Sequence, residues 1–333
     1  MRRLFLFLII FTVAILCFYF LYSQERLYES PKAEEYNIQE AEAEKTEEDK
    51  NEQELRKQIP ESRLPFQVNL SSEILEQGDT VLIQIKNRED MDQVSGELGG
   101  DKISFLKSES GNWIGIVGVD AKQSPGKYNL VINLPKEEFR KEITVVKRNF
   151  PVTELVVTEE LEKKGYTPST IEESIETKDN PSMYEIFEIY TPTTYFDKPF
   201  NYPLEKIEVV GAYGNIRKTE DIELQHLGVD LDAEENTPVY AINDGVVRFT
   251  EDLVNYGKTV IIDHGLGIFS VYLHLNKFQV SVGDVMERGD IIGLSGDTGY
   301  SIAPHLHFSV KLNNIKSMTS VDPLRFIETT KKF

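Results

Sequence analysis

The sequence contains very little cysteine, histidine or tryptophan for a chain of 333 residues. Its single cysteine, Cys17, lies within the apolar run of residues 4–22, so the rest of the chain has no disulfide and no thiolate that could act as a nucleophile or a ligand. All five histidines follow residue 225. Any metal site in the rest of the chain must therefore use nitrogen and oxygen ligands.

Positive charge is also scarce, with 36 Lys and Arg residues against 56 Asp and Glu residues and a net charge of −20. Nucleic-acid phosphates are bound by clustered Lys and Arg, so this composition disfavours a nucleic-acid partner. The sequence also lacks an HExxH motif. The helix-borne glutamate base of thermolysin-like metallopeptidases is therefore excluded.

The longest apolar run, residues 4–22, carries no charge. Its residues, at about 1.5 Å each in a helix, nearly span a hydrocarbon core of roughly 30 Å. Arg2 and Arg3 precede the run and Glu25 follows it, so the positive-inside rule places the remainder of the chain outside the cytoplasm. We predict a single-pass transmembrane signal anchor over 1–24, with a cytoplasmic N-terminus. A cleaved signal peptide is the alternative, although no small-x-small cleavage site follows the run.

Composition divides the rest of the chain into four parts. Residues 25–62 are rich in Glu, Gln and Lys and predict a solvated acidic linker. Residues 63–150 contain six short alternating runs between Gly-containing turns, which predict an immunoglobulin-like β-sandwich. Residues 151–200 predict a partly helical connector, with a capped helix at STIEESIE followed by an aromatic, proline-broken stretch. Residues 201–333 return to β runs with Gly- and Asp-rich turns, so the predicted fold class is mainly β.

Two of the five histidines stand one residue apart in the motif PHLHF. Side chains alternate along a strand, so His305 and His307 should point to one face, and Leu306 and Phe308 to the other. On this motif alone, a pair of surface histidines is an equally good interpretation.

The motif QHLGVDL places His226 four residues before Asp230. Four residues of straight strand span about 13 Å, which is too far for two ligands that each lie about 2 Å from one zinc ion. If both bind one metal, the chain must bend between them, and Gly228 is the residue that permits this bend. A core or surface pair is the alternative.

The remaining histidines lie at the ends of apolar runs. His274 ends the run VYLHL, and His264 lies in the turn DHGLG. We expect His264 to be structural, with a hydrogen bond to the backbone of a turn.

In chain order these motifs resemble the M23 family of zinc metallopeptidases, the lysostaphin-type enzymes. The resemblance covers about residues 200–327 and follows the order His-x-Gly-x-Asp, Tyr-x-His-Leu and Pro-His-Leu-His-Phe. It also includes YGNIR (213–217), TPVYAINDGVV (237–247), YGKTVIIDHGLG (256–267), VGDVMERGDIIGLSGDTG (282–299) and VDPLRF (321–326). Leu227 and Ala303 stand where the family more often has glycine, and neither is a ligand.

The resemblance implies an antiparallel β-sheet peptidase domain that binds one Zn²⁺ per chain. It implies His226, Asp230 and His307 as the ligands, with water in the open fourth position. His274 and His305 are then the implied catalytic pair. One would take a proton from the attacking water and pass it to the leaving amine, and the other would hydrogen-bond the tetrahedral intermediate. The sequence leaves open which histidine has which role.

The resemblance implies a zinc-dependent endopeptidase that hydrolyses peptide cross-links or bridges of bacterial peptidoglycan. Its partners would be peptidoglycan stem peptides and, through the N-terminal helix, the cell membrane, with the catalytic domain outside the cytoplasm. A protein regulator is left open. One alternative is a non-catalytic LytM-like scaffold or activator of other cell-wall hydrolases, and another is an exported peptidase that cleaves proteins. We also hypothesise that the connector, at residues 155–200, partly covers the catalytic groove.

Overall fold

The computed structural model describes residues 66–86, 92–108, 111–135, 137–313 and 318–332. All of them belong to the compact unit of residues 36–333. The predicted anchor at 1–24 and the predicted acidic linker at 25–62 lie outside the described residues. None of the helices in the described ranges has the length and apolar content needed to cross a membrane.

The first part of the described chain is a β region. Its strands are β1 (Gln67–Leu70), β2 (Ile74–Glu76), β3 (Thr80–Lys86), β4 (Ser95–Leu98), β5 (Asp101–Lys107), β6 (Trp113–Gly118), β7 (Gly126–Leu134) and β8 (Glu137–Val146). The six expected runs form β1, β3, β5, β6, β7 and β8, while β2 and β4 were not expected. The strands pair in the order β1-β3-β6-β5-β4-β7-β8-β2, antiparallel except for β2 beside β8. Alternation places Ile83, Ile85, Leu130 and Ile132 in one buried core.

The mainly β expectation is thus confirmed, and the immunoglobulin-like sandwich stays a prediction.

A short strand and three helical segments follow this region: β9 (Val152–Glu154), α3 (Glu159–Lys163), α4 (Pro168–Ser174) with the π-helical turn η2 (Ile175–Asp179), and α5 (Asn180–Phe187). The predicted cap of α4, Ser169, is wrong by two residues. Thr167 is the cap, because its side chain accepts a hydrogen bond from the Thr170 amide while Pro168 fills the first helical position.

Asp179 connects these helices by hydrogen bonds to the turn between β15 (Gly245–Leu253) and β16 (Gly257–Asp263). Its buried carboxylate accepts hydrogen bonds from the backbone amides of Val254 (3.0 Å) and Asn255 (2.7 Å). Since a buried carboxylate is tolerated only where its oxygens are hydrogen-bonded, this contact fixes the helices on that turn.

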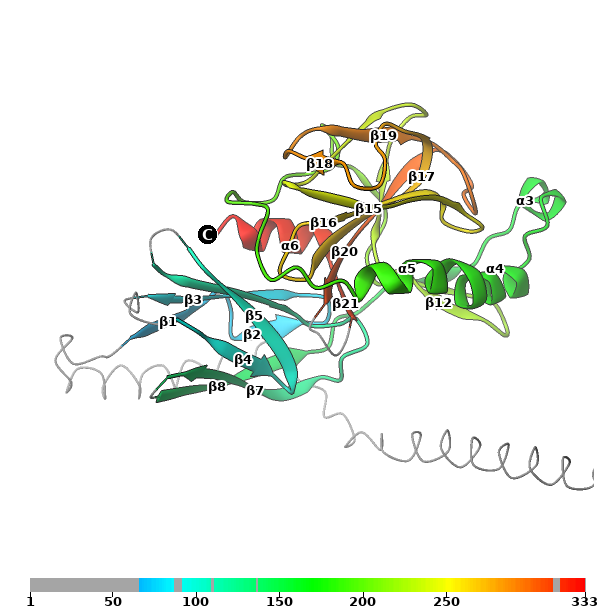
Figure 1. Cartoon of the computed structure of the whole chain (residues 1–333). Helices are drawn as coiled ribbons and strands as arrows, with labels where there is room; N and C mark the ends of the chain where they lie inside the picture. Colours follow the sequence, from blue (N-terminus) through cyan, green and yellow to red (C-terminus); the bar gives the residue numbers. More distant parts are fainter. Residues whose placement is uncertain (1–65, 87–91, 109–110, 136, 314–317, 333) are drawn as a thin grey trace, which may run out of the picture. The chain divides into compact units, whose positions relative to one another are not determined.

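Strands dominate the chain from residue 209 onward. They are β10 (Val209–Gly211), β11 (Ile216–Lys218), β12 (Glu223–Gln225), β13 (Val229–Asp232), β14 (Pro238–Tyr240), β15, β16, β17 (Ile268–Phe278), β18 (Val285–Met286), β19 (Ile291–Ser295), β20 (His305–Asn313) and β21 (Met318–Val321), followed by helix α6 (Pro323–Thr330) (Figure 1). The main sheet runs β10-β13-β20-β17-β16-β15-β18, with β14, β19 and β21 attached beside it. Leu306, Phe308 and Val310 of β20 point into its core.

A separate small sheet has the order β12-β11-β9, and β9 lies parallel to β11. The chain that leads into β9 is held by the C-terminal part of the molecule. Arg148 forms an ion pair of 2.9 Å with Asp322, the cap of α6, and the Ile216 amide donates to the Pro151 carbonyl at 2.8 Å. These contacts position the chain so that β9 lies along the edge of β11.

Candidate metal centre

His226 and Asp230 lie on either side of a bend between β12 and β13. His226 follows the last residue of β12, and Asp230 is the second residue of β13. A side chain at Gly228 is excluded, because a Cβ there would lie 2.4 Å from His307 Nε2 and 2.7 Å from the Phe308 carbonyl oxygen. The glycine therefore permits both the bend and the close approach of β20.

The register of β13 against β20 brings the third residue into place. Asp230 lies opposite His307, and Asp232 lies opposite His305. His305 and His307 consequently share one face of β20, while Leu306 and Phe308 are fully buried on the other face. A one-residue slip would turn both histidines into the core.

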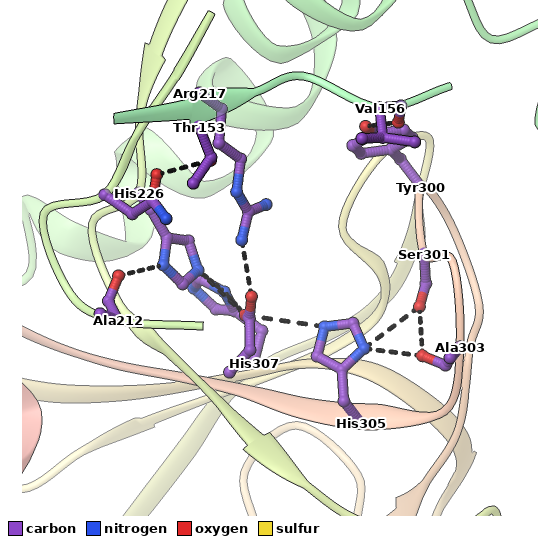
Figure 2. Close-up of polar contacts among 12 residues, drawn as sticks. Thr153, Val156, Ala212, Arg217, His226, Tyr300, Ser301, Ala303, His305 and His307 are labelled. Atoms are coloured by element: carbon purple, nitrogen blue, oxygen red, sulfur yellow. Dashed lines mark hydrogen bonds and ion pairs between the residues drawn. The ribbon is translucent and has the colours of Figure 1, made fainter. Parts of the chain in front are cut away.

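His226, Asp230 and His307 converge on one point. His226 Nε2, Asp230 Oδ1 and His307 Nδ1 are each 2.9 Å from one another. Figure 2 shows the His226 and His307 rings side by side below Arg217. In the described ranges these three residues are the group whose donor atoms could together hold a metal ion. The structure thus brings together the three ligands that the sequence predicts, and their role in binding stays a prediction.

The donor set fits a divalent metal. His226 Nδ1 donates to the Ala212 carbonyl at 2.9 Å, so in the neutral ring its Nε2 carries the lone pair that faces Asp230 and His307. Three donor atoms that converge in this way are stabilised by a shared cation. Two imidazole nitrogens and one carboxylate oxygen are typical ligands of a catalytic zinc site.

Burial and hydrogen bonding set the protonation of these groups. Burial lowers the pKa of His307 to about 4, although Asp230 opposes this shift. Burial alone would raise the pKa of Asp230, but its hydrogen bonds with His226 and His307 hold the pKa below the ordinary value. At neutral pH the cluster therefore presents a neutral His307 ring and a carboxylate, which are the ligating forms of both groups.

Arg217 is a member of the site that the sequence reasoning missed. Its Nη2 donates to Asp230 Oδ2 at 2.6 Å, while Asp230 Oδ1 faces the two histidines. The residue lies within the motif YGNIR, but no spacing rule assigned it a role. Arg217 fixes the rotation of the carboxylate, so that one oxygen stays directed at the cluster.

We expect Arg217→Ala to weaken zinc binding by roughly 10–100-fold, the usual cost of removing a partner of a metal ligand. Equilibrium competition with a chelator measures this affinity. The matched control is Lys218→Ala, because Lys218 is a cation on the same strand whose ion pair is with the exposed Glu223. Equal affinities of the two variants would contradict a positioning role for Arg217.

His305 and His274 lie beside the cluster. His305 Nδ1 donates to the Ala303 carbonyl at 2.8 Å, and its Nε2 lies 3.6 Å from Asp230 Oδ1. His274 Nδ1 donates to the Thr298 carbonyl at 2.8 Å, and the centroids of the His274 and His305 rings are 4.8 Å apart. Both rings therefore place an Nδ1 proton on a backbone carbonyl, and Nε2 of His305 faces Asp230.

His274 adopts a positive φ of 61° within β17, which is rare for a residue with a side chain. The pairing register of β17 shifts against β16 and against β19 near this residue, so the strand is bulged here. Bulges re-aim side chains next to functional sites, and this one directs His274 to the Thr298 carbonyl and the His305 ring. No local sequence pattern indicated the bulge.

Comparison with known proteins identifies this part of the chain. The family model of Peptidase family M23 matches residues 224–323, which include all five histidines and Asp230. Residues 224–323 are a peptidase M23 domain. Glycyl-glycine endopeptidase ALE-1 of Staphylococcus capitis is 41% identical over 107 residues, which are 31% of this chain and 29% of that protein.

Other similar proteins share the M23 domain. Peptidoglycan DD-endopeptidase ShyA of Vibrio cholerae is 44% identical over 85 residues, or 26% of this chain and 20% of that protein. The chain thus matches less than a third of the length of either relative. The crystal structure of the lysostaphin catalytic domain from Staphylococcus simulans is 32% identical, with a TM-score of 0.29, and the match covers 40% of this chain and 92% of that one.

His264 of the M23 domain lies outside the cluster. It is fully buried, with Nδ1 donating to the Asp244 carbonyl (2.8 Å) and Nε2 accepting from the Ser270 hydroxyl (2.8 Å). The aromatic stretch after α5 packs here, since the Tyr195 amide donates to the His264 carbonyl and the Phe200 ring contacts the His264 ring. Tyr195 and Phe200 therefore pack at His264, and the hypothesis that the connector partly covers the catalytic groove stays a prediction.

The buried His264 makes stability depend on pH. Burial lowers the pKa of His264 from 6.5 to about 4, so the unfolded chain binds more protons between these values. The stabilising contribution is complete above pH 6.5 and is lost as pH falls towards 4, by about 3 kcal/mol in all. We expect His264→Gln to remove this part of the dependence of the free energy of unfolding on pH. Denaturant unfolding at pH 7.5 and pH 4.5, with a chelator present for both proteins, measures the change in the free energy of unfolding between the two pH values. An equal change in the wild type and the variant would contradict the assignment.

Proposed function

We propose that the chain is a zinc-dependent endopeptidase that hydrolyses peptide cross-links or bridges of bacterial peptidoglycan. The observation that carries this proposal is the convergence of His226, Asp230 and His307 beside two further histidines whose Nδ1 atoms are held by backbone carbonyls. Support for the substrate comes from the relatives, whose names describe a glycyl-glycine endopeptidase and a peptidoglycan DD-endopeptidase. A scaffold without catalysis would not require this complete set of side chains.

His226 Nε2, Asp230 Oδ1 and His307 Nδ1 would hold the zinc ion. When bound, zinc supplies a Lewis acid that polarises the scissile carbonyl and makes water acidic enough to react at neutral pH. Asp230 contributes its charge through one oxygen only, because Arg217 occupies the other at 2.6 Å. The two neutral imidazoles leave the net charge of the ligands at −1.

His305 and His274 carry out the proton transfers in this proposal. Each holds its Nδ1 proton on a backbone carbonyl, so each can accept a proton at Nε2. One imidazole takes the proton of the attacking water and passes it to the leaving amine. The second, whose ring centroid lies 4.8 Å away, could donate to the oxyanion that develops on the carbonyl from Nε2 once that nitrogen is protonated as well, as an imidazolium.

Attachment to the cell membrane, with the M23 domain outside the cytoplasm, is part of the same proposal. It is supported by the uncharged run of residues 4–22 and by the arginines before it. In this arrangement the acidic segment 25–62 would allow the M23 domain to reach the cell wall.

The proposal is tested by incubating purified sacculi with the protein and separating the released muropeptides by mass. Newly released fragments with free peptide ends would establish a cell-wall endopeptidase, and their masses would identify the bond. Metal analysis should show one zinc ion per chain. Protein that holds zinc and releases no fragment would contradict the proposal.

A further inference from the structure

The turn between β15 and β16 is held from one side by the helices α4 and α5 and the turn η2. Asp179, the last residue of η2, is fully buried. Its carboxylate accepts hydrogen bonds from three consecutive backbone amides, those of Val254 (3.0 Å), Asn255 (2.7 Å) and Tyr256 (3.3 Å). The Asn255 side chain also donates to Asp179, at 3.2 Å. Removing this one carboxylate would leave the buried amide of Asn255 without an acceptor.

The same turn holds the backbone of His274. The His274 amide donates to the Tyr256 carbonyl at 3.0 Å, at the point where the pairing of β17 with β16 shifts between Lys258 and Val260. The positive φ of His274 is a conformation that persists only where the surrounding structure holds it in place. Tyr256 supplies part of this support, and Asp179 fixes Tyr256.

The turn also holds the loop to which the His274 ring is bonded. The Tyr300 amide donates to the Asn255 carbonyl at 2.8 Å, and His274 Nδ1 donates to the Thr298 carbonyl two residues earlier in the same loop. The turn and the loop touch backbone to backbone, since a Cβ at Gly299 would lie 2.4 Å from the Asn255 carbonyl oxygen. A shift of the turn would therefore move both the backbone and the ring of His274.

We propose that Asp179 is a positioning residue of the active site, which fixes the turn between β15 and β16 and thereby sets the conformation and the ring direction of His274. The helices of the connector are then part of the catalytic unit, although they lie outside residues 224–323, which match the family model. The effect of Asp179 on catalysis rests on the function proposed above, whereas its effect on the conformation of His274 does not.

Asp263 provides a matched control. It is also a fully buried carboxylate that joins the connector to the M23 domain, since it accepts hydrogen bonds from the Thr191 hydroxyl (2.7 Å) and the Gly265 amide (2.8 Å). It forms an ion pair of 3.0 Å with Arg248 as well. Asp263 is the last residue of β16, whereas the turn held by Asp179 precedes the first residue of this strand. Replacing Asp263 therefore disturbs the domain at the end of β16 that is remote from His274.

The test compares Asp179→Asn with Asp263→Asn in the full chain loaded with zinc. Asparagine keeps the shape of the side chain but places a donor where the carboxylate accepts from backbone amides. A misplacement of about 1 Å can lower a rate on the order of a hundredfold, so we expect Asp179→Asn to lower kcat roughly 10–100-fold. The substrate is a cross-linked muropeptide dimer isolated from sacculi. Asp263→Asn should leave kcat nearly unchanged, and both variants should keep the KM and the zinc content of the wild type.

Repeating both substitutions in a His274→Ala background identifies the residue through which Asp179 acts. Residues that act as a unit are not additive, so Asp179→Asn should cause no further loss of kcat in this background. The same fold loss in both backgrounds would overturn the proposal. Equal kcat values of Asp179→Asn and Asp263→Asn would also overturn it, as would loss of zinc from Asp179→Asn alone.

A spectroscopic measurement gives a result that does not depend on activity. In protein labelled with ¹⁵N-histidine, the Nδ1 proton that His274 donates to Thr298 should give a slowly exchanging ring N–H signal, assigned by its loss in His274→Ala. In Asp179→Asn this proton should exchange with water at least about tenfold faster, because the elements around it open more readily. The signal should be unchanged in Asp263→Asn. Equal exchange rates in the two variants would overturn the positioning role.

The two proposals fail in different ways. If the wild type cleaves no muropeptide, the proposed peptidase function is contradicted, and the exchange rates alone decide whether Asp179 positions His274. If Asp179→Asn does not fold, Asp179→Glu takes its place with Asp263→Glu as its control. This change keeps both acceptor oxygens and lengthens the side chain by one methylene, so it displaces the turn without removing its hydrogen bonds. A loss of kcat confined to Asp179→Glu, and absent in the His274→Ala background, is then expected, and equal effects of the two substitutions would overturn the proposal.

Discussion

Replacing His307 with alanine is expected to lower the rate of peptidoglycan hydrolysis by at least about a thousandfold. Removing a residue that hydrogen-bonds to a metal ligand lowers metal affinity or activity roughly 10–100-fold. His307 is placed to be a ligand itself, so its removal should have a larger effect. Its Nδ1 lies 2.9 Å from both His226 Nε2 and Asp230 Oδ1, so its removal leaves two donors of three. Release of muropeptides from sacculi and zinc content per chain are the two measurements.

The control for His307→Ala is His264→Ala, which removes the buried histidine of the same domain that does not contact the cluster. At neutral pH this control should keep its zinc and its activity, although its free energy of unfolding should fall. If His307→Ala retained stoichiometric zinc and wild-type cleavage, the assignment of His307 as a ligand would be wrong. Zinc loss in both variants would instead indicate general unfolding.

The residues themselves predicted only the local geometry of the metal centre, and the grouping of His226, Asp230 and His307 was implied by the resemblance to the M23 family. Alternation along β20 alone places His305 and His307 on one face. The short distance that one ion allows requires a bend between His226 and Asp230, and at Gly228, between them, the chain lies too close to β20 for a side chain. These inferences use strand geometry and the size of a metal site. They need no information on which strands pair.

The contacts that were missed depend on pairing between distant segments. Arg217 meets Asp230 because β10, which precedes it, pairs with β13, and β11 turns back through β12 to His226. The pairing of β9 with β11 joins residues about sixty positions apart, and three residues of polar strand give no pattern that predicts it. The positive φ of His274 likewise follows from the pairing of β17 with two different neighbours.

The position of the cap of α4 was also missed, although it depends only on neighbouring residues. The pattern Ser-x-x-Glu indicated Ser169, but Thr167 and Thr170 form the reciprocal pair of hydrogen bonds instead. Pro168 between them favours the first helical position, where its missing amide costs nothing. A proline next to a candidate cap is therefore a stronger signal than the acidic residue three positions later.

The second large effect is expected for His305→Ala. This variant should keep its zinc, because His305 Nε2 lies 3.6 Å from Asp230 Oδ1 and is not among the three convergent donors. Loss of one of the two imidazoles proposed for proton transfer and oxyanion stabilisation should lower kcat by roughly 10²–10⁴-fold, the usual contribution of a positioned acid or base. KM should change much less, since the other contacts to the peptide are retained.

Rescue by added imidazole separates proton transfer from a structural role. The Ala303 carbonyl and Ser301 hydroxyl that hold Nδ1 of His305 remain in the variant, so a free imidazole can occupy the vacated position. Partial recovery of kcat with imidazole, and no recovery of His307→Ala under the same conditions, is the expected result. A His305→Ala variant that loses zinc and is not rescued would place His305 among the residues that support the ligands, and would leave His274 as the acid and base.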